Sequence, residues 1–199
     1  MSAAAITILK GMTRWEPNAR GRLVQAAMEL YSERGFEQTT VAEIAERAGL
    51  TERTFFRHFA DKREVLFAGA DALQELVVSA VAGAPESAAP IDAAVAGVQA
   101  AAAFLQEGRE FSRQRQAVIV ASAELREREL IKLASLASAI ADALRGRGVP
   151  EPAASLTAEV AIAVFRIAFE HWVDDTGRRD FAQLIGDSLD ELKAVTAGE

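Results

Sequence analysis

The residues of this sequence best suited to specific chemistry follow Gly49, where Thr51, Arg53 and Thr54 begin a short predicted helix. Hydroxyl and guanidinium groups in the first turn of a helix can form hydrogen bonds with base edges in the major groove of DNA. Arg53 has the planar fork that matches guanine O6 and N7, with a phosphate as the alternative partner. This group of residues predicts recognition of a nucleic acid.

Two further residues could assist that recognition. Thr40 stands at the start of the preceding predicted helix, where its hydroxyl and its backbone N–H can reach a phosphate. Phe56 could contact a thymine methyl group or a sugar edge, and packing within its own small domain is the alternative.

A helix-turn-helix would hold these residues in place. Thr40 and Glu43 have the spacing of a capping box that opens a helix over 40–48, and Thr51 is a suitable N-cap for a helix over 51–58. Gly49 supplies the turn between them, because glycine adopts a left-handed backbone freely. An ordinary helical hairpin with a glycine turn is the alternative interpretation.

The rest of the chain also has helical periodicity, with no convincing two-residue alternation, so the predicted fold class is all-α. We expect a flexible tail over 1–16, a three-helix domain over 17–66 and a larger helical domain over 67–199, joined by a fourth helix. About nine helices are expected in all, the others covering 18–34, 61–81, 91–105, 110–123, 125–145, 152–175 and 179–196.

The charge distribution is compatible with a DNA partner. The 199 residues have a net charge of −7, but residues 1–65 contain ten Lys and Arg against nine Asp and Glu. The remaining residues contain twelve against twenty, so the acidity lies away from the predicted reading region. Arg14, Arg20 and Arg22 could form a basic arm on the duplex, or could simply be solvated.

The sequence offers little for other functions. It has no cysteine, and its two histidines are 113 residues apart, so neither a metal site nor a cofactor is expected. It lacks the G-x-S-x-G, phosphate-loop and H-E-x-x-H motifs, which argues against an enzyme. No uninterrupted apolar run approaches the roughly 18 residues of a membrane span. A cytoplasmic protein without a membrane partner is therefore expected.

Several motifs resemble the DNA-binding domain of the tetracycline-repressor (TetR) family of regulators. They are Arg34-Gly35-Phe36, Thr39-Thr40-Val41, Ile44-Ala45, Ala48-Gly49-Leu50 and the run from Thr54 to Lys62. The resemblance implies that His58 and Lys62 hold the DNA backbone. Phe56 departs from the family, which usually has Tyr there, so the resemblance implies no phosphate hydrogen bond from that position.

The resemblance also implies a repressor that binds a palindromic operator and leaves it when a small molecule binds the larger domain. Two reading heads are normally needed for tight binding, so we expect a homodimer. The predicted helices over 152–175 and 179–196 are the expected interface, because the first is apolar on most of its circumference. Burial of that helix within one subunit is the alternative.

An apolar effector pocket is expected in the larger domain, although each aromatic residue there could be ordinary core. Arg166 interrupts an apolar helix, and a buried arginine needs a partner, either an internal acid, which we favour, or an anionic ligand. The C-terminal part also resembles TetR regulators with acyl-CoA-like ligands, which implies a long apolar effector with an anionic head. The residues expected to line the pocket are Phe104, Ile119, Phe165, Arg166, Phe169, His171 and Trp172.

The leading hypothesis is therefore a ligand-responsive DNA-binding regulator. A helical module that binds only other proteins is the alternative.

Overall fold

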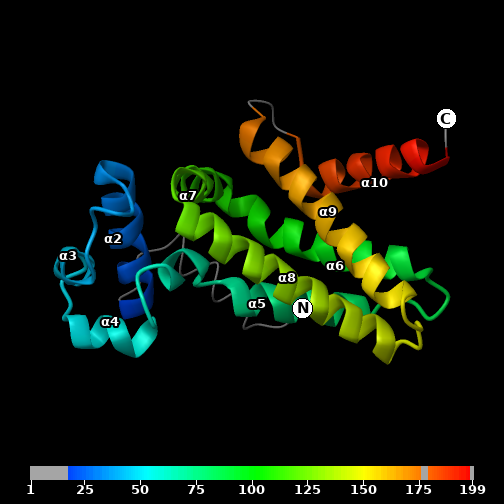
Figure 1. The fold of residues 1–199 in the computed structure, drawn as a ribbon, viewed down its shortest axis with the longest axis horizontal. Helices are drawn as coiled ribbons and strands as arrows, with labels where there is room; N and C mark the ends of the chain where they lie inside the picture. Colours follow the sequence, from blue (N-terminus) through cyan, green and yellow to red (C-terminus); the bar gives the residue numbers. More distant parts are fainter. Residues whose placement is uncertain (1–17, 176–178, 198–199) are drawn as a thin grey trace. The chain divides into compact units, whose positions relative to one another are not determined.

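The computed structural model describes residues 18–175 and 179–197, and within them it confirms the all-α prediction (Figure 1). This described part contains nine α-helices, two short 3-10 helices and no strand. The elements are α2 (Ala19–Arg34), α3 (Val41–Arg47), α4 (Glu52–His58), η1 (Glu64–Phe67), α5 (Ala70–Ala82), α6 (Pro90–Leu105), η2 (Gln106–Gly108), α7 (Arg109–Ala121), α8 (Ala123–Gly146), α9 (Ala153–Asp174) and α10 (Phe181–Ala197). The expected tail over 1–16 and Arg14 lie outside the described residues.

The chain divides into two compact units that differ from the expected division at residue 66. The first unit contains the described residues up to Asp71 together with Glu110–Leu130. The second contains Ala72–Arg109 and the chain from Ile131 onward. The helical segment 110–130 joins the first unit because Val118, Ile119 and Leu125 are buried in the same apolar cluster as the residues of α2 and α4. Sequence order alone does not reveal that packing.

The first unit is built on α2. Asn18 caps the helix by accepting a hydrogen bond from the backbone N–H of Arg20, and Gly35 ends it at a φ of 86°. Leu23, Ala27 and Leu30 lie on the buried face of α2. Together with Ile44 of α3 and Phe55 of α4 they form a small apolar core, so the positions of α3 and α4 are set by packing against α2.

The expected single helix over 61–81 is two elements. The carboxylate of Asp61 accepts hydrogen bonds from the backbone N–H groups of Arg63 and Glu64, and the 3-10 helix η1 follows. Val65, Leu66 and Phe67 are all buried, so this short segment is embedded in the first unit. Gly69, a weak helix former, separates it from α5.

The segment Glu64–Ala82 has the length and mean hydropathy, 1.6, that a membrane-spanning helix needs. Of its most apolar 18-residue stretch, 28% is buried. It is the one such stretch among the described residues, and a single stretch is weak evidence. The break after η1 divides it, and Val77 and Val81 pack in the core of the second unit. We therefore interpret it as part of a globular fold.

The second unit is centred on α6, α9 and α10. Its core includes Val98, Ile162 and Ile185 from these three helices. Gly97 lets α5 and α6 approach closely, because a Cβ atom at that position would lie 2.6 Å from a methyl group of Val81. Ala93, Ala101 and other small residues of α6 serve the same close packing.

Candidate nucleic-acid interface

The predicted helix-turn-helix is present as α3, a turn and α4. The hydroxyl of Thr40 accepts from the backbone N–H of Glu43, and the Glu43 carboxylate accepts from the backbone N–H of Thr40 at 2.9 Å, completing the capping box. Gly49 has a φ of 65°, the left-handed conformation expected for the turn. Thr51 caps α4 through the backbone N–H of Thr54 at 3.2 Å.

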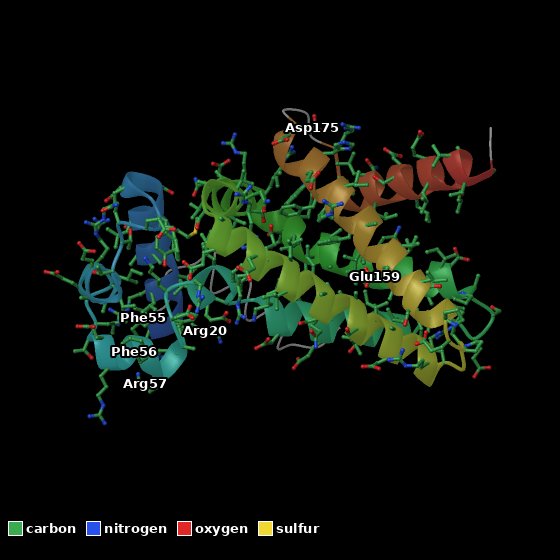
Figure 2. The ribbon with its side chains drawn as sticks, viewed as in Figure 1. Arg20, Phe55, Phe56, Arg57, Glu159 and Asp175 are labelled. Carbon is green, nitrogen blue, oxygen red and sulfur yellow. The ribbon has the colours of Figure 1, made fainter. Side chains whose placement is uncertain are left out.

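The outer face of α4 is free and cationic. Arg53 and Arg57 are exposed, and neither forms a hydrogen bond or an ion pair with another described residue. Figure 2 shows Phe55, Phe56 and Arg57 together along α4. Arg57 was not among the residues predicted from the sequence, although its spacing of four residues from Arg53 places both on the same face of a helix.

Phe56 is 56% exposed, while its neighbour Phe55 is fully buried. The two rings meet edge to face with their centroids 5.5 Å apart, so Phe56 lies over the small core without entering it. An aromatic ring left more than half in water is available for an apolar contact. This exposure argues against complete packing of Phe56 within the small domain, and its contact with DNA remains a prediction.

The threonines at the start of α4 are close together. The hydroxyl oxygens of Thr51 and Thr54 are 3.1 Å apart and share a hydrogen bond. Thr51 is exposed and Thr54 is partly exposed. Both hydroxyls therefore lie at the end of α4 that would enter a groove.

Thr40 is exposed, but its polar groups are already engaged. Its hydroxyl donates to the Glu43 carboxylate at 2.7 Å, and its backbone N–H donates to the same oxygen. These bonds, led by that of the hydroxyl, lower the pKa of Glu43, so this carboxylate is charged at neutral pH. A phosphate at Thr40 would have to displace Glu43.

Lys62 is also engaged, and with backbone groups. Its ammonium group donates to the carbonyl oxygens of Phe36 and Thr39, both at 2.9 Å, and lies 4.2 Å from the centre of the Phe36 ring. This geometry favours a structural role that ties the segment after α4 to the loop before α3. Contact between Lys62 and a phosphate remains a prediction.

His58 is half-buried, and its Nε2 atom is buried without a hydrogen-bond partner among the described residues. An unpaired buried nitrogen is costly, and a small shift of the ring would be needed to reach a phosphate. The contact between His58 and DNA also remains a prediction.

The expected basic arm includes one residue with a different role. Arg20 donates to the carbonyl oxygen of Ala68 at 2.6 Å, and its guanidinium carbon lies 5.3 Å from the centre of the Phe59 ring. Arg20 therefore connects α2 to the segment after η1 and lies beside α4 in Figure 2. Arg22 is exposed and lies next to Gly49.

The residues expected to line an effector pocket do not share one unit. Ile119 is fully buried in the core of the first unit. Phe165, Phe169 and Trp172 belong to the second unit and form an aromatic cluster with Phe181, whose ring stacks on Trp172 at 4.8 Å. Within the described chain, the buried indole nitrogen of Trp172 has no acceptor.

The polar members of that expected pocket lie at the surface. His171 is exposed, and the expectation that Arg166 is buried is wrong, because its side chain is 54% exposed. The Arg166 guanidinium lies at the surface of α9 and pairs with Glu170 at 3.6 Å, one turn along the same helix. The internal acid that we favoured is present, although an exposed pair of this kind contributes little. Phe104 on α6 is half-buried.

The helix α9 has two apolar faces. Ala158, Phe165 and Trp172 are buried within the second unit. Leu156 and Ile167, on the other face, are 63% and 43% exposed. Both side chains therefore remain exposed in the single chain.

Two family models match the chain. One, for bacterial regulatory proteins of the tetR family, matches residues 23–68. The other, for the MftR C-terminal domain, matches residues 88–197, which is more than half of the chain. The regulator TcmR of Streptomyces glaucescens is 36% identical over 89 residues, which cover 45% of this chain and 39% of that relative. The match thus spans only about two fifths of the relative's length.

Solved structures share the fold at low identity. FadR from Bacillus subtilis, solved with stearoyl-CoA, has a TM-score of 0.59 and 16% identity, and the match covers 87% of this chain and 97% of that one. FadR from Thermus thermophilus, a repressor solved with lauroyl-CoA, has a TM-score of 0.56 and 24% identity over 87% and 93% of the two chains. At these identities the likeness shows the fold alone.

The position of Lys62 gives a first prediction. Lys62→Ala should lower the free energy of unfolding by about 1–3 kcal/mol, because the carbonyls of Phe36 and Thr39 lose their donor. Denaturant titration measures the change. Lys193→Ala, at an exposed lysine of α10, is the control and should have little effect. Unchanged stability, together with a slope of log binding constant against log salt concentration that falls by about one, would instead assign Lys62 to a phosphate.

Proposed function

The chain belongs to the TetR family of bacterial regulatory proteins, and we propose that it is a ligand-responsive repressor that binds a palindromic operator as a homodimer. The family and the relatives found are transcriptional regulators, not enzymes. The observation that carries the proposal is the exposed outer face of α4, where Arg53, Phe56 and Arg57 are all available to a partner. Since a bacterial operator lies in the cytoplasm, we also propose a cytoplasmic location.

In this proposal the beginning of α4 reads bases. Thr51, Arg53 and Thr54 lie in the part of a recognition helix that enters the major groove. Arg53 has no internal partner to release, so its fork is available for guanine O6 and N7. The exposed ring of Phe56 can cover a thymine methyl group.

The remaining contacts would position the head on the phosphates. Arg57 lies one turn further along α4 than Arg53, away from the end that enters the groove, so we assign it to the DNA backbone. Thr40, His58 and Lys62 are the other proposed backbone contacts. Each is partly committed to an internal role, and Arg57 is therefore the strongest of the set.

Dimerisation would use α9 and α10. Leu156 and Ile167 both lie on the exposed face of α9. This face can meet the same face of a second subunit in a symmetric contact. Val195 of α10 is also an exposed large apolar residue, at 62%. Burying these side chains would stabilise a dimer that presents two reading heads to half-sites about 34–36 Å apart.

The effector would bind the second unit and favour a state with lower operator affinity. The aromatic cluster of Phe165, Phe169 and Trp172 supplies apolar surface, and Phe104 is a further candidate. The two FadR neighbours were solved with acyl-CoA esters, which supports an acyl-CoA-like effector here. His171 and Arg166 are the proposed partners of its anionic head, since both are exposed.

A protein-interaction module without DNA binding is the alternative function. It would leave the cationic face of α4 without a purpose, and it is tested by the same experiment as the proposal.

Selection of bound sequences from a random DNA pool should return a palindrome. Arg53→Ala should weaken the free energy of binding to the selected site by about 1–3 kcal/mol. It should also relax the base preference at one position in each half-site. Arg57→Ala should weaken binding to all DNA sequences alike, because a phosphate contact is lost. The slope of log affinity against log salt concentration (the salt slope) should fall by about one. Arg113→Ala, at an exposed arginine of α7, is the control. Recovery of no sequence by the unaltered protein would favour the interaction module.

The proposed interface is tested by charge insertion. Leu156→Glu combined with Ile167→Glu should convert the dimer to monomers in sedimentation at micromolar concentration, because buried carboxylates would repel each other across the symmetric contact. Leu130→Glu is a matched control, since Leu130 is 62% exposed on α8. A monomeric unaltered protein, or a double variant that stays dimeric, would contradict the assignment.

The effector class is tested by thermal unfolding. At about 100 times its Kd, lauroyl-CoA or stearoyl-CoA should raise the unfolding midpoint by roughly 5–10 °C, and coenzyme A alone should not. Phe169→Ala should reduce this shift, because the half-buried ring of Phe169 lies at the edge of the aromatic cluster. Val120→Ala, at an exposed residue of α7, is the control. No shift with either ester would exclude acyl-CoA effectors of these lengths.

A further inference from the structure

The segment between α4 and α5, residues 60–69, is not α-helical, and we refer to it as the connector. Several of its carbonyl oxygens are satisfied by side chains from other elements. Tyr31 donates to the carbonyl oxygen of Lys62 at 2.7 Å, and Arg20 donates to that of Ala68. Arg115 of α7 donates through Nε to the carbonyl oxygen of Leu66 at 2.7 Å. The backbone of the connector is therefore held by side chains of α2 and α7.

Arg115 is the most buried of these donors to carry a charge. Its side chain is 19% exposed, and its guanidinium carbon lies 4.9 Å from the centre of the Phe67 ring. Its Nη1 atom is 3.3 Å from a carboxylate oxygen of Glu129 on α8. Burial lowers the pKa of Arg115 and Glu129 raises it, yet the guanidinium remains charged because its usual pKa is very high.

Two other ion pairs join the connector to α8. Arg63 pairs with Glu124 at 2.9 Å, and Arg128 donates to Glu64 at 2.6 Å. The side chains of Arg63 and Glu124 are 39% and 46% exposed, so water weakens their attraction. Arg115 differs because it combines a partly desolvated ion pair, a carbonyl contact and an aromatic contact in one side chain.

The connector and the inner face of the recognition helix belong to one apolar cluster. Leu66 and Phe67 are buried in the same apolar cluster as Phe55 and Phe59, which lie on α4 and at its C-terminal end. A shift of η1 would therefore alter the packing behind α4. Arg115 bonds to η1 at the Leu66 carbonyl oxygen and to Glu129 of α8, and it forms no hydrogen bond with a described residue of α4.

We propose that Arg115 is a positioning residue for operator recognition, which holds η1 so that α4 keeps the orientation needed for base contacts. This inference rests on the proposed DNA-binding function. A planar guanidinium can bridge the Leu66 carbonyl and the Glu129 carboxylate while lying over Phe67. A lysine keeps the charge but lacks the planar fork.

The test compares specific with nonspecific DNA binding by the full-length chain carrying Arg115→Gln, Arg115→Lys or Glu129→Gln. Affinity for the selected operator should fall roughly tenfold or more in Arg115→Gln and less in Arg115→Lys. Affinity for random DNA and the salt slope should not change, because no phosphate contact is removed. Circular dichroism at the assay temperature is the measurement that checks whether each variant is folded.

The matched control is Arg113→Gln, two residues away on α7, where the side chain is 62% exposed and pairs with Glu110. Its operator affinity should equal that of the unaltered protein. The double variant Arg115→Gln with Glu129→Gln should lose less affinity than the two single losses combined, because neither partner leaves an unpaired buried charge.

Two results would overturn the proposal. One is a folded Arg115→Gln variant with reduced thermal stability but unchanged operator affinity, which would limit Arg115 to a structural role. The other is a reduced salt slope, which would make Arg115 a direct phosphate contact. If Arg115→Gln does not fold, Arg115→Lys and Glu129→Gln decide the matter by the same criteria. Failure of the unaltered protein to bind any DNA refutes the proposed function itself.

Discussion

A partly buried carbonyl oxygen without a donor costs free energy, and the first unit avoids this cost at the Lys62 and Leu66 carbonyls of the segment after α4. That segment cannot use regular helical hydrogen bonds throughout, because it turns from α4 into a 3-10 helix and then reaches Gly69. Side chains of Tyr31, Arg20 and Arg115 supply donors instead. Lys62 acts in the opposite direction and supplies the loop before α3.

Two groups of cations in the first unit therefore have different roles. Arg20, Lys62 and Arg115 have their donors directed at backbone groups inside the unit. Arg53 and Arg57 have no such partner among the described residues and remain exposed on α4. A recognition surface needs both groups, because base contacts require free donors on a helix whose orientation does not vary. Net charge alone cannot distinguish them.

The second unit depends on a helix that has both buried and exposed apolar residues. Its helix α9 fills the core through Phe165 and Trp172 and leaves Leu156 and Ile167 exposed, on the face where we propose that a second subunit binds. The small residues of α6, with Gly97 against Val81, allow α5 and α6 to pack closely in this core. Dimerisation and effector binding are thus proposed for neighbouring faces of one helix, so a rearrangement of its aromatic cluster could also change the subunit contact.

The sequence by itself determined the helical class, most helix positions and the motif over 40–58, because caps, glycine turns and helical periodicity are local signals. Only the tertiary structure decided which cations are structural, since Lys62 and Arg20 reach carbonyls that are distant in sequence. It likewise placed Ile119 in the first unit and Arg166 at the surface. Such assignments depend on contacts between elements, and these contacts leave no periodic pattern in the chain.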